Sequence, residues 1–117
     1  MCIRDRYDID LDIRKIAEKL AKSNKLENIS FKELCDHGEL EKISNNSTSN
    51  HSTFLLIDCE GFEDQLLTPK KCAALSTMDI LVETHDHLVS GITSELKKRF
   101  SETHKITTLS SLSLIHI

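Results

Sequence analysis

The sequence contains few of the residues that mark several large protein classes. Its 117 residues include three glycines, one proline and no tryptophan, which excludes collagen-like and low-complexity chains. No apolar run approaches the roughly 20 residues that a membrane-spanning helix needs, and no charged-then-apolar start resembles a signal peptide. We therefore expect one modest, soluble, cytoplasmic domain with no membrane partner.

Clusters of basic residues are also missing. The chain has 15 Lys and Arg residues against 19 Asp and Glu residues, and its formal net charge is −4. Binding to a phosphate backbone depends on a positive field, so we expect no nucleic-acid partner.

The two ends of the chain match a translated sequencing adapter. Residues 1–6 read as the translation of ATGTGTATAAGAGACAG, the mosaic end of a transposase adapter. The reverse complement, CTGTCTCTTATACACATC, encodes Leu-Ser-Leu-Ile-His-Ile, which is the sequence of residues 112–117. Because both strands of one adapter match at opposite ends, we interpret both segments as adapter-derived and residues 7–111 as an internal part of the natural protein. The alternative is that the ends are natural amphipathic termini.

The cysteines of residues 7–111 lack the spacing of a disulfide framework or a zinc site. Cys35, Cys59 and Cys72 are odd in number, widely spaced and without a Cys-x-x-Cys pair. Neither a disulfide scaffold nor a zinc site is predicted, and we expect reduced, mostly buried thiols.

Apolar strands alternate with helices along residues 7–111. Helical spacing predicts a helix from about Ile13 to Asn24, whose core-facing residues are Ile13, Ile16, Ala17, Leu20 and Ala21. Further strands are predicted at 29–35, 54–57, 80–82 and 106–109, a helical turn at 39–43, an exposed loop at 44–53, and helices at 62–67, 71–75 and from about 93 to 103. The apolar runs at 54–57 and 80–82 are typical of parallel strands covered on both faces. This alternation indicates an α/β fold with a mainly parallel sheet and helices on both of its faces.

Ionisable residues follow two of the predicted strands. Asp58 and Glu60 come after residues 54–57, and Glu83 and His85 come after residues 80–82. If these strands are neighbours and persist, the four groups converge at the carboxyl edge of the sheet, where ligands of such sheets bind. They would serve proton transfer, substrate orientation or a divalent metal. The alternative is an ordinary solvated strand end.

A second acidic pair precedes the first predicted helix. Asp8 and Asp10 follow the end of a strand, where an acid can bind the hydroxyls of a cofactor ribose. An acidic residue there also suits the N-cap of the helix. Both interpretations stay open, and the two residues can divide the roles.

Three segments together resemble S-adenosylmethionine-dependent methyltransferases, especially the FkbM-like group. They are Tyr-Asp-Ile-Asp at 7–10, Asp-Cys-Glu-Gly-Phe-Glu at 58–63 and Ile-Leu-Val-Glu-Thr-His-Asp at 80–86. The resemblance covers nearly all of residues 7–109. It implies a partial Rossmann-like fold and an enzyme that moves a methyl group to a small-molecule or sugar acceptor of the hydroxyl type.

The resemblance also implies roles for individual residues. Asp8 matches the acid that holds the cofactor ribose, and Cys35 and Asp36 match by position the region beside adenine. Asp58 and Glu60 would lie near the methionine end of the cofactor, with Glu83 and His85 on the acceptor side. Their expected work is to orient a hydroxyl and take its proton.

One part of the family pattern is missing. The first strand of the family and its glycine-rich turn should precede Tyr7. In the family that strand lies between the second and fourth strands, so here those two strands either pair directly or keep open inner edges. We therefore expect this chain to be marginally stable, prone to aggregate and nearly inactive.

Two other functions remain open from the sequence. One is a non-catalytic α/β domain in which the acids bind a divalent ion or a partner. The other is another nucleotide-cofactor enzyme, such as a nicotinamide-dependent oxidoreductase, because an Asp after a second strand also suits a dinucleotide ribose.

Overall fold

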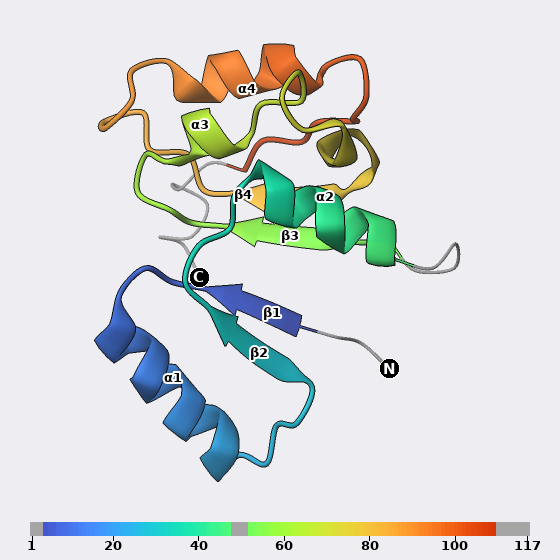
Figure 1. Cartoon of the computed structure of the whole chain (residues 1–117). Coiled ribbons are helices and arrows are strands. Elements are labelled where there is room, and N and C mark those ends of the chain that lie inside the picture. Colours follow the sequence, from blue (N-terminus) through green and yellow to red (C-terminus); the bar gives the residue numbers. More distant parts are fainter. Residues whose placement is uncertain (1–3, 48–51, 110–117) are drawn as a thin grey trace. The chain divides into compact units, whose positions relative to one another are not determined.

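A computed structural model describes residues 4–47 and 52–109 of the chain as a mixture of helices and short strands (Figure 1). The chain divides into two compact units, Met1–Asp36 and His37–Ile117. Residues 112–117, interpreted above as adapter-derived, lie outside the described residues. No helix in the described part of the chain is long and apolar enough to cross a membrane.

The first unit is a β-α-β element. Strands β1 (Arg4–Tyr7) and β2 (Ile29–Lys32) pair in parallel, and helix α1 (Leu11–Ser23) connects them (Figure 1). Asp10 begins the helix because its Oδ1 accepts hydrogen bonds from the backbone N–H groups of Asp12, at 2.8 Å, and Ile13, at 3.1 Å. The predicted N-cap is therefore confirmed.

The expectation for the apolar face of α1 is correct in part. Ala17 and Ala21 are the buried residues of the helix, whereas Ile16 and Leu20 are 54% and 59% exposed. The small alanines let the helix approach its neighbours, and the larger apolar side chains lie away from that contact. A strand also ends just before Asp8, as expected, since β1 ends at Tyr7.

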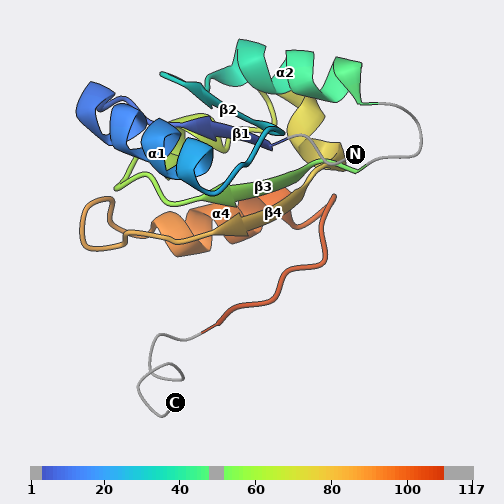
Figure 2. The same cartoon turned by 90° about the horizontal axis from the view of Figure 1, so that it is seen from below.

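The second unit packs helices on a pair of strands. In chain order its elements are α2 (His37–Asn46), β3 (Phe54–Ile57), α3 (Glu63–Leu66), the 3-10 helix η1 (Ala73–Thr77), β4 (Asp79–Val82) and α4 (Ile92–Phe100). Strands β3 and β4 are parallel, as predicted, and Figure 2 shows them in front of α4. The largest fully buried apolar side chains belong to Leu40, Leu67, Leu75, Met78 and Ile92.

One continuous sheet with helices on both faces is not what the structure describes. The strands form two separate two-stranded sheets, β1–β2 and β3–β4. Strands β1 and β3 do not pair with each other. Of the two alternatives expected without the family's first strand, direct pairing or open inner edges, the described strands therefore show open inner edges. The prediction of parallel pairing holds, and the prediction of a single sheet does not.

The expectation that residues 54–57 are covered on both faces is also wrong. Only Ile57 of β3 is buried, whereas Phe54 and Leu56 are 62% and 71% exposed. Leu81, the register partner of Leu56 on β4, is 49% exposed. Successive side chains of a strand point to opposite faces, so one face of this pair is covered and the other carries an apolar patch.

The remaining differences are local. Helix α2 runs to Asn46, so the loop expected to start at residue 44 begins later, and residues 48–51 of that loop lie outside the described part. No strand forms at 106–109, where Leu109 is 79% exposed. Helix α4 begins after Gly91, in a left-handed conformation with φ 75°, and not at a Thr or Ser cap.

Candidate active site

Strands β3 and β4 end in register and bring two carboxylates side by side. Ile57 pairs with Val82, and the backbone N–H of Glu83 donates a hydrogen bond to the carbonyl oxygen of Ile57 at 2.9 Å. Asp58 and Glu83 are therefore the first residues beyond the last pair of the ladder. Both are exposed.

A tight turn after β3 places the next acid. Glu60 and Gly61 both have positive φ angles, 53° and 98°. This turn lets α3 begin at Glu63, whose side chain reaches back so that its Oε1 accepts a hydrogen bond from the N–H of Cys59 at 3.3 Å. Glu63 is completely buried.

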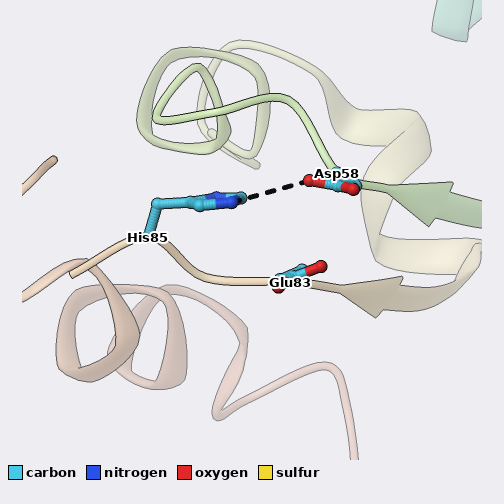
Figure 3. A group of neighbouring side chains, drawn as sticks. All are labelled: Asp58, Glu83 and His85. Atoms are coloured by element: carbon cyan, nitrogen blue, oxygen red, sulfur yellow. Dashed lines mark ion pairs between the residues drawn. The ribbon is translucent and has the colours of Figure 1, made fainter. Parts of the chain in front are cut away.

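His85 connects this buried acid to Asp58. The imidazole Nδ1 lies 2.7 Å from Oε1 of Glu63, and Nε2 lies 3.5 Å from Oδ1 of Asp58. Figure 3 shows the imidazole directed toward Asp58, with Glu83 beside them on the neighbouring strand. One potential ligand atom from each of Asp58, Glu83 and His85 lies within 4.8 Å of the others.

The loop that carries His85 is fixed at several points. The His85 carbonyl oxygen accepts hydrogen bonds from the N–H groups of Leu88, at 2.8 Å, and Val89, at 2.9 Å. Asp86 accepts hydrogen bonds from the hydroxyl and backbone N–H of Thr93 at the start of α4. These contacts set the position of the imidazole, which is itself 8% exposed.

The electrostatics of the pair follow from these contacts. The hydrogen bond with Glu63 raises the pKa of His85, and the negative charges of Glu63, Asp58 and Glu83 raise it further against the effect of desolvation. Burial favours the neutral acid at Glu63, but hydrogen bonds from its own N–H, His85 and Cys59 outweigh burial and lower its pKa. The pair therefore favours a carboxylate next to an imidazolium.

The nearby thiol is not a nucleophile at neutral pH. Burial, with the charge of Glu63, raises the pKa of Cys59 to about 12. Cys59 and Cys35 are only half-buried, and Cys72 is buried. None of these three cysteines forms a disulfide among the described residues, and the expectation of burial holds for Cys72.

Three of the four groups predicted to converge do so. Asp58, Glu83 and His85 meet, whereas Glu60 lies outside the group because the strand ends at Ile57 and the turn redirects the chain. Sequence analysis missed the role of Glu63. A signal exists, because Glu63 shares the spacing i, i+3 and i+4 with Leu66 and Leu67, which marks it as a polar residue on the buried face of a helix.

Four of the residues predicted to bind the cofactor belong to the first unit. Asp8 is half-buried and accepts a hydrogen bond from the N–H of Asp10 at 3.0 Å, while Asp10 caps α1. Cys35 is half-buried and Asp36 exposed, both after the end of β2. Their part in cofactor binding remains a prediction.

Comparison with known proteins gives no relative: no family model, curated protein or solved structure matches this chain.

Proposed function

We propose that residues 7–111 are part of an S-adenosylmethionine-dependent methyltransferase of the FkbM-like group, with a partial Rossmann-like fold and a small-molecule or sugar hydroxyl as acceptor. The observation that carries the proposal is the meeting of Asp58, Glu83 and His85 beyond the carboxyl ends of two adjacent parallel strands. Ligands of parallel α/β sheets bind at this end.

Methyl transfer needs little from the protein beyond orientation of the acceptor hydroxyl and removal of its proton. The acceptor oxygen attacks the methyl carbon of the sulfonium, the C–O bond forms, and S-adenosylhomocysteine leaves with the electron pair of the broken C–S bond. Asp58, Glu83 and His85 would orient the hydroxyl, and the carboxylate of Asp58 or Glu83 would take up its proton. Glu63 suits this work because it fixes the imidazole from the Nδ1 side and leaves Nε2 directed at Asp58.

The proposal also assigns cofactor roles to individual residues. Because Asp10 caps α1, we assign the ribose to Asp8, whose neighbour Asp10 then serves the helix start. Cys35 and Asp36 would lie beside adenine. Asp58 and Glu60 would lie near the methionine end.

The test uses the chain joined to the sequence that its gene encodes on either side of residues 7 and 111. We expect this extended chain to bind S-adenosylmethionine in calorimetry and the 117-residue chain to bind it weakly or not at all. Asp8→Asn, which keeps a hydrogen-bond acceptor for Asp10, should weaken binding by about tenfold, the effect of one charge-assisted hydrogen bond. Asp12→Asn, an exposed acid in the first turn of α1, is the matched control.

Two results would overturn the proposal. The first is an extended chain that folds and does not bind S-adenosylmethionine. The second is a source gene that encodes Met1 to Ile117 as they stand, because the missing strand and glycine-rich turn then never preceded Tyr7. In that case the non-catalytic domain becomes the better hypothesis.

A further inference from the structure

We propose that Asp58, Glu83 and His85 hold a first-row divalent transition-metal ion, with Glu63 as the residue that positions His85. The ion would also receive the acceptor hydroxyl. That second part rests on the proposed function, whereas binding of the ion does not.

The spacing of the three side chains suits one ion. Metal–ligand bonds of about 2.0–2.2 Å place two ligand atoms of the same ion about 3–4.4 Å apart. Nε2 of His85 and Oδ1 of Asp58 are 3.5 Å apart, and the ligand atoms of all three residues lie within 4.8 Å of one another. At 3.5 Å the imidazole and the carboxylate are too far apart for a good hydrogen bond. This distance suits two groups that share a third partner.

Glu63 provides an independent observation in favour of a metal. Histidines that bind metals generally donate their other ring N–H to a carboxylate or carbonyl, which fixes the ring and its tautomer. His85 has this arrangement: Nδ1 contacts the fully buried Glu63, and Nε2 is directed at Asp58 (Figure 3). Oε2 of Glu63 is buried without a hydrogen-bond partner among the described residues.

The negative charges around His85 also favour binding of a cation. Asp58, Glu63 and Glu83 together carry three negative charges when ionised. Burying the carboxylate of Glu63 without full compensation is costly. His85 binds an ion only as the neutral imidazole, so a divalent ion would replace its proton and offset two of the three negative charges.

The donor set indicates the class of ion. Two carboxylates and one imidazole combine oxygen and nitrogen ligands without a thiolate, a set that suits Mn²⁺ or Zn²⁺ better than Mg²⁺, which prefers oxygen ligands alone. Three protein ligands leave coordination positions open, as catalytic sites do. An open position would accept a hydroxyl and lower its pKa. Because Asp58 and Glu83 would then bind the ion, the proton would pass to water and not to their carboxylates.

The first experiment titrates the metal-free 117-residue chain with Mn²⁺. Electron paramagnetic resonance of free Mn²⁺ gives the affinity, and NMR line broadening locates the ion on the unmodified chain. We expect one ion per chain and selective broadening of the His85, Asp58 and Glu83 signals. Broadening elsewhere, or no stoichiometric binding, would overturn the inference.

Variants then assign the ligands. Asp58→Asn and Glu83→Gln should each weaken Mn²⁺ binding by at least tenfold, and Glu63→Gln by about 10–100-fold, the range found for residues that orient a metal ligand. Asp79→Asn is the control, because Asp79 is an exposed acid at the opposite end of β4. Equal losses in Asp79→Asn and Asp58→Asn would mean nonspecific attraction and would also overturn the inference.

The outcomes separate this inference from the proposed function. An extended chain that binds S-adenosylmethionine and methylates an acceptor with undiminished rate in the presence of a chelator would overturn the proposed role of the ion in the reaction. The methyltransferase proposal would remain. A chain that binds Mn²⁺ at His85 and never binds S-adenosylmethionine would support the ion and overturn the methyltransferase.

Discussion

Glu63 and His85 form a buried carboxylate–imidazole pair, with 2.7 Å between Oε1 and Nδ1. The pair joins two segments that are 22 residues apart, the turn after β3 and the loop after β4. It therefore does two things. It connects the ends of two neighbouring strands, and it holds Nε2 of the imidazole toward Asp58, where an acceptor or an ion would bind.

The protonation of His85 should depend on Glu63. In the metal-free chain, Glu63→Gln removes the charge that raises the pKa of His85, so that pKa should fall toward its ordinary value. A pH titration of the imidazole ¹⁵N signals measures the change. Glu102→Gln, an exposed acid after α4, is the control and should leave the titration unchanged. An unchanged His85 pKa in Glu63→Gln would contradict the contact.

The same pair should produce a maximum in stability against pH. The lowered pKa of Glu63 contributes stability above its ordinary value of 4.5, and this contribution is lost as the pH falls through the folded-state pKa. The raised pKa of His85 contributes stability below its ordinary value of 6.5, and this contribution is lost as the pH rises through the folded-state pKa. Both contributions are present together between 4.5 and 6.5.

Urea unfolding of the metal-free chain and of His85→Gln over this pH range tests the maximum. The difference in unfolding free energy should be largest inside the window and smaller on both sides. Asp58, Glu83 and His87 also face His85, and His87 contacts it edge to face. Repeating the series with His87→Gln separates its contribution. A difference that stays flat with pH, or that is largest above about pH 8, would argue against the pair.

The turn that precedes Glu63 should require glycine. Gly61 has φ 98°, beyond the left-handed region that other residues reach, and a Cβ there would contact Leu88 and Val89 at 3.4 and 3.5 Å. The Gly61→Ala side chain would be strained at this φ angle, with its Cβ in van der Waals contact with Leu88 and Val89, so we expect a loss of about 1–3 kcal/mol in unfolding free energy. Gly91→Ala is the matched case, with φ 75° and no atom within 4 Å of its Cβ. It should cost about 1 kcal/mol.

Chemical denaturation of both glycine variants gives the comparison. Equal losses would mean that the Leu88 and Val89 contacts do not confine the turn. A larger loss for Gly91→Ala would contradict the prediction outright.

Local patterns in the sequence predicted most of the elements and part of the site. The structure confirms the strands at 54–57 and 80–82 and the capping role of Asp10. These features depend on residues that are close in the sequence. Asp58, Glu83 and His85 were found because parallel strands end at the same edge. Glu60 lies outside this group because period-two alternation does not continue past the end of β3.

Properties that depend on distant partners were not predictable in the same way. The apolar run at 54–57 has the composition of a strand covered on both faces, but whether a second layer covers it depends on what else packs there. The contact of Glu63 with His85 joins residues 22 apart, and spacing within a helix marks only the buried face. The strand expected at 106–109 has suitable side chains and no pairing strand among the described residues.

The exposed face of β3 and β4 should drive self-association. Leu56 and its register partner Leu81 present an apolar patch with Phe54, and exposed patches of this kind promote aggregation. Leu56→Thr removes apolar surface and introduces a β-branched residue that suits a strand, so we expect less association in sedimentation velocity and a change in unfolding free energy within about 0.5 kcal/mol. Ile57→Thr, at the buried neighbour on the covered face, should instead cost about 2–4 kcal/mol. If Leu56→Thr destabilises the chain as much as Ile57→Thr does, another part of the protein covers this face in solution.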